Sequence, residues 1–340
     1  MQTKHKASPA FDTLSLGALA PELAKYQQEP PQMASGAVGK HGYLRLRFAD
    51  RGAKSTLHEM ERKVPLLVQK ALYWDEEMPF LPCVPMISTS GCVLQGDRLT
   101  VEIEVDAGAC AHITTQSATK IHSMDNNFAA QTQHIRVGKQ AYLEFMPDQV
   151  IPHRHSRFIS DTLIECDSTA TVLYSEILMP GRKHHHQDER FGFDVYSSRI
   201  SAKNEAGDVL FTEKLVLTPK EKPLDVVGVM GTFDIYGNVI VLTPSTCQDE
   251  ILSRSRSFYS EELCHGVSRL PNGAGLIYKV LANDSTRIKK AIRDFWQTVR
   301  QVATGYSLPA PFLWKVCPLH QRVAFRKRAL TALFRQTSSE

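Results

Sequence analysis

The sequence predicts a mainly β fold with a small helical part at its C-terminal end. Segments in which apolar and polar residues alternate recur about every ten residues over roughly two hundred residues. Gly, Pro, Asp and Ser residues mark turns between these segments, and no clear amphipathic helix separates them. This pattern favours a β-sandwich, a barrel or a β-helix over a fold of alternating strands and helices. No repeat of fixed length decides among the three.

The first 38 residues predict a flexible N-terminal arm. They are rich in Ala, Pro, Gln and Ser and contain adjacent Pro30 and Pro31. Such a composition buries too little apolar surface to offset the entropy of ordering the chain. We therefore expect folded structure to start near Gly39, with a β body over residues 39–283. Residues 284–340 would form a helical segment that packs on this body.

The β body begins with two clear alternating segments, Tyr43–Phe48 and Leu99–Val105. Alternation of this kind is typical of a strand with one wet face. Shorter β-compatible segments follow, each bounded by turn residues: Ala111–Thr115, His134–Val137, Tyr142–Met146, Arg157–Glu165 and Thr171–Leu178.

Two later segments, Ser198–Lys203 and Val209–Leu217, flank the turn Asn204–Asp208 and predict a hairpin. Val226–Thr243 predicts a further run of apolar strands. Asp249–Leu263 is polar with scattered apolar residues and is a candidate helix.

The C-terminal part predicts a helix that Asp284 can cap and that runs to about Ala303, with Gly305 as a stop. Its apolar residues recur at helical spacing: Ile288, Ile292, Phe295, Val299 and Val302. A second short helix is expected over Gln321–Gln336.

Composition excludes several classes of protein. The net charge of +4 is small for 340 residues and does not suggest a nucleic-acid binder. The seven cysteines are odd in number and include no CxxC pair, which argues against a disulfide framework and a structural zinc site. Neither a secretory signal nor a long uncharged apolar stretch is visible, so we expect a cytoplasmic protein. Phosphate-binding loops, nucleophile elbows and the H-E-x-x-H motif are absent, so no catalytic residue is predicted.

An ordered set of short motifs resembles the UreD/UreH-type urease accessory proteins. It starts with Gly96–Val101, the turn Gly108–Ala111 and Thr114–Lys120, and continues with Leu143–Asp148 and Ile151-Pro152. Further matches run from about residue 39 to 316: Gly42–Leu44, Pro65–Lys70, Gly181-Arg182 and Pro311–Trp314. Two segments depart from the family pattern. Lys183–Gln187 intervenes after Gly181-Arg182, and His153–His155 stands where the family tends to have an apolar or aromatic residue.

The resemblance implies a stacked, β-helix-like sheet body and a function. It implies a non-enzymatic chaperone that binds apo-urease on one side and a UreF-type protein on the other, and the latter recruits a UreG-type GTPase. Nickel would pass through the body to the urease site, so no cofactor is expected to bind tightly and Ni²⁺ would be transient. Phe295, Trp296, Arg300 and Trp314 are the candidate contacts with the UreF-type partner, and packing on the β body is an equally good interpretation of the helix.

A metal conduit should hold its ion weakly and at several points. Isolated carboxylates, hydroxyls and an occasional imidazole suit that demand better than a closed thiolate cage. Candidate channel groups on the matching segments are Asp97, Thr115, Glu144, Asp148 and Glu176. For each of them an ordinary structural role is the alternative; Asp97, for example, is a natural turn residue.

Histidines are auxiliary candidates for nickel. His184, His185 and His186 are consecutive, and successive strand residues point to opposite faces, so a solvated loop is the simpler interpretation. His153 and His155 would share one face of a strand. Two other functions remain open at this point. One is a carbohydrate-active β-helix or β-sandwich enzyme, which only the strand-rich pattern supports, and the other is a stand-alone nickel store built on the histidines.

Overall fold

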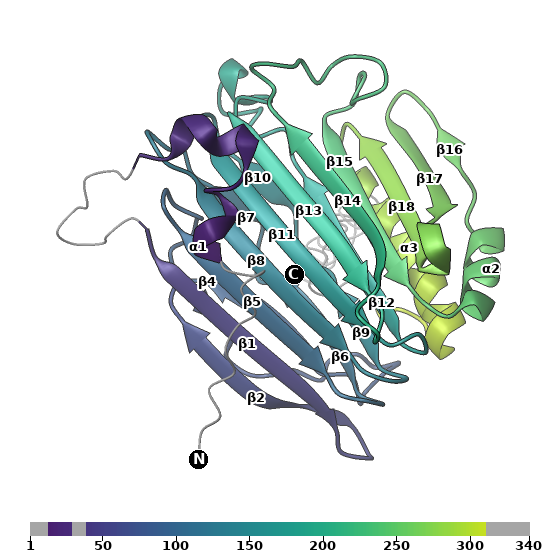
Figure 1. The fold of residues 1–340 in the computed structure, drawn as a ribbon. Coiled ribbons are helices and arrows are strands. Elements are labelled where there is room, and N and C mark those ends of the chain that lie inside the picture. The colour runs from purple at the N-terminus through teal and green to yellow at the C-terminus, as the bar shows by residue number, and fades with distance from the viewer. Residues whose placement is uncertain (1–12, 29–38, 311–340) are drawn as a thin grey trace, which may run out of the picture.

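The computed structural model describes residues 13–28 and 39–310 of the chain and confirms a mainly β protein. Two β-sheets lie face to face, the two longer helices cover the outer face of one of them, and the short N-terminal helices lie on the outer face of the other (Figure 1). Neither sheet closes into a barrel. None of the helices in the described part is long and apolar enough to cross a membrane.

The first sheet has seven strands in the order β14-β13-β11-β8-β5-β1-β2. Its five central strands are parallel, and the two outermost strands pair antiparallel with their neighbours as hairpins. The strands are β1 (His41–Asp50), β2 (Ser55–Lys63), β5 (Arg98–Val105), β8 (Ala129–Val137), β11 (Arg157–Cys166), β13 (Val195–Lys203) and β14 (Val209–Leu217). The predicted hairpin over 198–217 is therefore confirmed as β13 and β14.

The second sheet has eleven strands, and its main path runs β16-β17-β18-β15-β12-β9-β6-β4-β3; off this path β10 pairs with β12, and β7 pairs with β10. The pairs β4–β6, β6–β9 and β9–β12 are parallel. The strands are β3 (Leu66–Leu67), β4 (Cys83–Ser88), β6 (Cys110–Thr115), β7 (Thr119–Ile121), β9 (Tyr142–Phe145), β10 (Val150–Pro152), β12 (Thr171–Leu178), β15 (Ile235–Leu242), β16 (Phe258–Tyr259), β17 (Leu263–Arg269) and β18 (Gly275–Ala282).

The chain alternates between the two sheets, as in a β-helix. It passes from β5 to β6, then from β8 to β9, and then from β11 to β12, so each pair stacks on the one before it. The coils, each made of one such strand pair and its connections, differ in length. Arg98 pairs with Ala130, 32 residues on, whereas Ala129 pairs with Phe158, 29 residues on. Unequal coils explain why the sequence shows no repeat of fixed length although the strands are stacked.

Between the sheets, equivalent positions of successive coils form columns of side chains. At one end of the strands the columns are apolar and buried, as in Ile103, Ile135 and Ile164 of the first sheet. Ile113, Phe145 and Tyr174 form a facing column from the second sheet, and the rings of Phe145 and Tyr174 stack with centroids 5.3 Å apart. This half of the interior is a dry core held together by the burial of apolar surface, and Phe145 and Tyr174 lie at its border with the other half.

The helix α3 (Ser285–Thr304) covers the outer face of the second sheet, where it packs with α2 (Ser245–Arg254) on β15 and β18 (Figure 1). The predicted caps are confirmed. The Asp284 carboxylate accepts hydrogen bonds from two backbone N–H groups of the first turn, and Gly305 ends the helix with a φ of 78°. The buried side of α3 includes Ile288, Ile292 and Val299, as the periodicity predicts.

Residues 13–28 fold onto the outer face of the first sheet, although we expected them to belong to a mobile arm. They contain α1 (Thr13–Leu16) and the 3-10 helix η2 (Pro21–Tyr26). The Thr13 hydroxyl lies 2.7 Å from that of Thr100 and 2.6 Å from that of Thr132. Leu23 is fully buried in a cluster of apolar side chains that includes Phe128. A few well-placed apolar residues order this part despite its polar composition.

Two further predictions are corrected. In Val226–Thr243 only Ile235–Leu242 is a strand; the earlier residues form turns in which Gly228 and Gly231 have positive φ. Within Asp249–Leu263 the chain leaves α2 at Arg254 and enters the edge strand β16, so the helix begins earlier and is shorter than expected. The remaining short 3-10 helices are η3 (Gln187–Glu189) and η4 (Pro271–Gly273). The predicted helix over Gln321–Gln336 lies outside the described residues.

Candidate functional site

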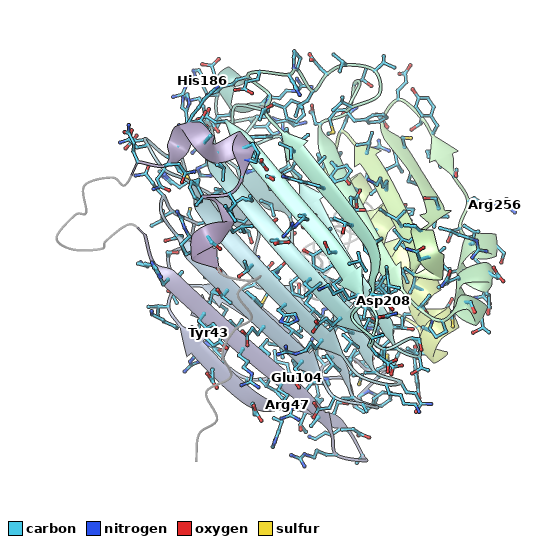
Figure 2. The ribbon with its side chains drawn as sticks, viewed as in Figure 1. Tyr43, Arg47, Glu104, His186, Asp208 and Arg256 are labelled. Atoms are coloured by element: carbon cyan, nitrogen blue, oxygen red, sulfur yellow. The ribbon has the colours of Figure 1, made fainter. Side chains whose placement is uncertain are left out.

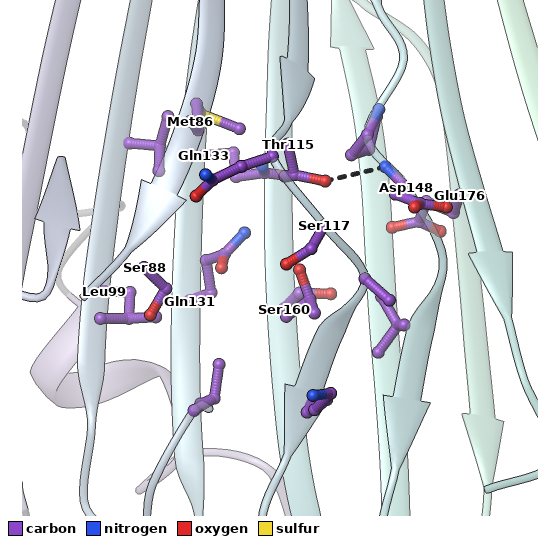
Figure 3. A pocket seen from close by; sticks show the side chains of 18 of the residues that line it. Met86, Ser88, Leu99, Thr115, Ser117, Gln131, Gln133, Asp148, Ser160 and Glu176 are labelled. Carbon is purple, nitrogen blue, oxygen red and sulfur yellow. Dashed lines mark hydrogen bonds between the residues drawn. The ribbon is translucent and has the colours of Figure 1, made fainter. Parts of the chain in front are cut away.

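A cavity of about 150 Å³ lies between the two sheets at the end of the strands opposite the dry core (Figure 3). The columns of side chains turn polar here. Leu99 is followed in the next two coils by Gln131 and Ser160, and Thr115, Pro147 and Glu176 line the space from the second sheet. Except for Pro147, these side chains can be followed around the space in Figure 3. The cavity has room for several water molecules.

The cavity presents oxygen atoms that are not all satisfied within the protein. The hydroxyl of Ser160 is buried and has no hydrogen-bond partner among the described residues. The Thr115 hydroxyl accepts a hydrogen bond from the backbone N–H of Asp148 at 2.9 Å. Asp148 itself forms an ion pair of 2.6 Å with Lys289 of α3. A buried hydroxyl without a partner costs free energy unless water or a ligand forms a hydrogen bond with it. This space is therefore suited to hold water or a polar ligand.

Glu176 is the carboxylate that faces this cavity without a cation beside it. Hydroxyl groups of Tyr174 and Ser198 donate hydrogen bonds to it, at 3.1 Å and 3.0 Å. Burial raises the pKa of Glu176 to about 7; the two hydroxyls act in the opposite direction, and the negative charge of Glu213 raises it further. Its side chain keeps some accessible surface because the cavity reaches it. Near neutral pH this carboxyl can therefore release or take up a proton.

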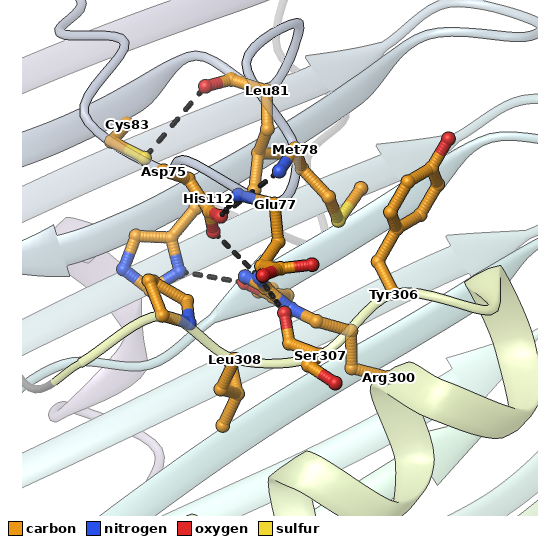
Figure 4. A network of polar contacts seen from close by, with 12 residues as sticks. Asp75, Glu77, Met78, Leu81, Cys83, His112, Arg300, Tyr306, Ser307 and Leu308 are labelled. Atoms are coloured by element: carbon orange, nitrogen blue, oxygen red, sulfur yellow. Dashed lines mark hydrogen bonds and ion pairs between the residues drawn. The ribbon is translucent and has the colours of Figure 1, made fainter.

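Glu144 lies on the outer face of the second sheet, beneath α3, and does not line the cavity (Figure 4 shows the surrounding network). Arg300 of α3 donates two hydrogen bonds of 2.8 Å to its carboxylate, and Trp296 donates a third at 2.7 Å. The hydroxyl of Tyr142 donates at 2.7 Å, and a ring nitrogen of His112 lies 2.9 Å away. Every oxygen lone pair of this carboxylate is thus in use.

The Glu144 network extends to a second carboxylate. Arg300 also contacts Asp75 at 2.5 Å, and Asp75 in turn accepts backbone hydrogen bonds from Glu77 and Met78. Burial alone would raise the pKa of Glu144, but the charge of Arg300 and the hydrogen bonds hold it well below its usual range. The network is a satisfied, permanently ionised structure that joins α3 to the sheet body.

Comparison with known proteins identifies the family. The family model described as "UreD urease accessory protein" matches residues 40–315. A protein of Yersinia pseudotuberculosis named "Urease accessory protein UreD" is 61% identical over 303 residues, which cover 88% of this chain and 94% of that protein. Proteins with the same name from Yersinia enterocolitica and Photorhabdus laumondii are 58% and 57% identical, again over 88% of this chain and 94% of theirs.

The chain belongs to the UreD family. It is thus a urease accessory protein, a maturation factor rather than an enzyme. The alternative of a carbohydrate-active enzyme is set aside by the match, which extends over most of the chain.

Of the five predicted channel residues of this UreD family member, the cavity brings together three, namely Thr115, Asp148 and Glu176. Glu144 belongs to the network under α3. Asp97 is fully buried at the start of β5, where its carboxylate accepts backbone hydrogen bonds from Lys40 at 3.0 Å and Leu94 at 2.8 Å. It thus has the turn role that was its structural alternative.

Sequence reasoning missed the other polar residues of the UreD cavity, among them Ser117, Gln131, Gln133 and Ser160. The sequence contains part of the information that would have identified them. Gln131 and Gln133 interrupt a segment whose inward positions are otherwise apolar, but only the pairing of strands shows that they face the same space as Glu176.

The five histidines predicted as auxiliary nickel ligands lie apart from the Glu144 network. His153 is buried, and its ring lies beside that of His122, with ring centroids 5.5 Å apart. His155 occupies a turn with a φ of 62°, and its ring contacts Lys220 at 2.7 Å. The predicted pairing of His153 with His155 on one face of a strand is therefore wrong, because β10 ends at Pro152. Burial lowers the pKa of His153 to about 4, and the charge of Arg182 lowers it further.

The three consecutive histidines lie exposed on the loop that precedes β13, and Figure 2 shows His186 at that end of the molecule. The loop is fixed by ion pairs of 2.7 Å that join Lys183 and Arg190 to Asp234. A nitrogen of the His186 ring accepts a hydrogen bond from the backbone of Asp188. Within the described residues no group of three or more His, Cys, Asp or Glu side chains is arranged to hold a metal ion.

The candidate partner contacts on α3 are buried within the UreD chain itself. Phe295, Trp296 and Arg300 have exposed fractions of 4%, 3% and 1%. A partner would reach them only if α3 left the sheet body. Trp314 lies outside the described residues.

Proposed function

We propose that this UreD family member delivers nickel to apo-urease in the cytoplasm through the polar cavity between its two sheets. It would bind apo-urease and a UreF-type protein, which recruits a UreG-type GTPase. The observation that supports the proposal most is the change of the interior from a dry core to a cavity lined by Thr115, Asp148 and Glu176.

The donors of the cavity suit a transit role. Carboxylate, hydroxyl and amide oxygens hold Ni²⁺ less tightly than thiolates or clustered imidazoles do. Glu176 can accept a divalent ion when its proton leaves, and it returns to the neutral form when the ion moves on. On the facing sheet, Ser160 offers a hydroxyl that has no partner in the part of the chain that the structure describes. An ion can thus leave bulk water without being trapped.

Substitution of Ser160 by Phe tests the proposal because it fills the cavity from inside. The variant and the wild type would each be produced together with apo-urease and the other accessory proteins, and urease activity, urease nickel content and the recovered complex would be measured. We expect S160F to assemble the complex and to lower urease activation several-fold.

Ser201→Phe is the matched control, since it places the same group on the outward side of β13 in the same sheet. It should activate urease as the wild type does. Full activation by S160F, in a complex of normal composition, would contradict nickel passage through this cavity.

A further inference from the structure

Two histidines that the family motifs do not explain lie side by side at one end of the second sheet. The strands β7 and β10 are parallel, and the last paired residues are Ile121 and Pro152. The residue that follows each strand is a histidine, so the register brings His122 and His153 together. Their ring centroids are 5.5 Å apart, and the ring planes are inclined by 55°. We propose that His122 and His153 form a two-imidazole binding site for a borderline divalent transition metal such as Ni²⁺ or Zn²⁺.

The separation of the rings fits one shared ion. With metal–nitrogen bonds of about 2.1 Å and a ring nitrogen about 1.1 Å from its ring centre, two imidazoles on a tetrahedral ion have centres about 5.2 Å apart. The measured 5.5 Å requires a side-chain adjustment of only a few tenths of an ångström. Such an adjustment lies within the ordinary freedom of an aromatic χ2 angle.

The hydrogen bonds of the pair leave nitrogen atoms for a metal. The Nδ1 atom of His122 lies 3.1 Å from the backbone carbonyl oxygen of Ser123, so it carries the proton and Nε2 is left as the ligand. A backbone carbonyl on the far nitrogen is the usual support of a metal-bound histidine. For the ring of His153, the described residues provide no hydrogen-bond partner, although only 6% of this residue is exposed.

The surroundings predict weak and open coordination. Lys120 and Arg182 lie near His153 and repel a cation, but Arg182 is itself paired with Glu189 at 2.5 Å. Two protein ligands leave the remaining positions to water or to a group from another protein. The site stands two residues beyond Lys120, which lines the cavity between the sheets. It is thus suited to pass an ion rather than to store it.

This inference stands on the geometry of the two rings and does not depend on the proposed nickel delivery. Other exposed histidines would obscure it, so the starting chain for the test carries His41→Ala, His58→Ala, His155→Ala, His184→Ala, His185→Ala and His186→Ala. Nickel binding to this full-length chain is measured by equilibrium dialysis and calorimetry with NiCl₂ alone, and the ligands of the bound ion by X-ray absorption. Far-UV circular dichroism checks that each variant is folded.

We expect the most tightly bound Ni²⁺ of the starting chain to show imidazole scattering in its absorption spectrum. Adding His122→Gln or His153→Gln should weaken this binding by at least about tenfold, and the double variant should abolish it. Excess Mg²⁺ should not compete, since it prefers oxygen ligands. Unchanged number and affinity of bound Ni²⁺ in the folded double Gln variant would overturn the site, as would displacement of the ion by Mg²⁺. Because urease activation is not the readout, this test is separate from that of the proposed delivery.

Discussion

Glu144 and Glu176 lie on neighbouring parallel strands, β9 and β12, and are both removed from bulk water, yet their surroundings differ completely. Glu144 faces α3 and is neutralised by Arg300, with hydrogen bonds to both oxygens. Glu176 faces the space between the sheets, with two hydroxyl groups for partners and a cavity beside it. The difference shows that burial alone does not decide how a carboxylate is satisfied. If Glu176 takes part in the proposed nickel delivery, its incomplete satisfaction next to open space is what distinguishes it from Glu144.

The largest expected effect on stability comes from removing the cation of the Glu144 network. Arg300→Met leaves Glu144 and Asp75 buried without their cation, which costs about 3–5 kcal/mol of the free energy of unfolding. Urea unfolding followed by circular dichroism measures this loss. Lys290→Met on the exposed face of α3 is the control and should change stability by less than about 0.5 kcal/mol. A loss for R300M as small as that of the control would mean that the network does not fasten α3.

Removing the charge of Glu176, by contrast, should increase stability at neutral and higher pH. Because the pKa of Glu176 is raised to about 7, the native state binds its proton where the unfolded state does not, and its contribution to stability falls as pH rises from about 4.5 through 7. Glu176→Gln removes this dependence. Above pH 7 the variant should be more stable than the wild type by roughly 2 kcal/mol, after allowance for screening by the cavity. Below pH 4.5 the two proteins should be equally stable.

Stability measured from pH 4 to pH 9 decides this prediction. Glu144→Gln serves as the comparison, since its low native pKa makes the ionised form the stabilising one, so E144Q should be destabilised across the same range. A Glu176 variant that is less stable than the wild type at pH 8 would show that the carboxylate is as well satisfied as Glu144.

A smaller effect is expected for a single donor of the Glu144 network. Trp296→Phe keeps most of the buried ring but removes the N–H that donates to Glu144. Hydrogen bonds to charged groups contribute about 1.5–3 kcal/mol, so the unfolding free energy should fall by about 2 kcal/mol. Thermal and urea unfolding would reveal it, and an unchanged free energy would mean that water replaces the indole.

The smallest effect is expected where a hydroxyl has no partner. Ser160→Ala in the cavity should alter stability by less than about 0.5 kcal/mol, because no protein hydrogen bond is lost. Ser55→Ala is the matched substitution, since the Ser55 hydroxyl accepts a hydrogen bond from the buried N–H of Cys110 at 2.8 Å, and it should cost about 1–2 kcal/mol. Equal losses of unfolding free energy in the two variants would contradict the difference between a bonded and an unbonded hydroxyl.

The sequence predicts the β class, most strand positions and the caps of α3, because each depends on neighbours along the chain. It does not predict the stacking, since coils offset by 32 and 29 residues leave no periodic signal. It names Thr115, Asp148 and Glu176 but cannot separate them from Glu144, because only the strand pairing shows which side of the sheet each one faces. The arm at residues 13–28 was misjudged for a related reason, as the burial of Leu23 depends on residues far along the chain.

The most direct test of the central claim is to locate nickel in the folded chain. Crystals of the full-length protein soaked in millimolar NiCl₂ and measured at the nickel absorption edge should show an anomalous peak between the sheets, within bonding distance of Glu176. The peak should vanish in E176Q crystals treated in the same way. Nickel confined to the surface, with the cavity filled by water alone in both crystals, would contradict the account.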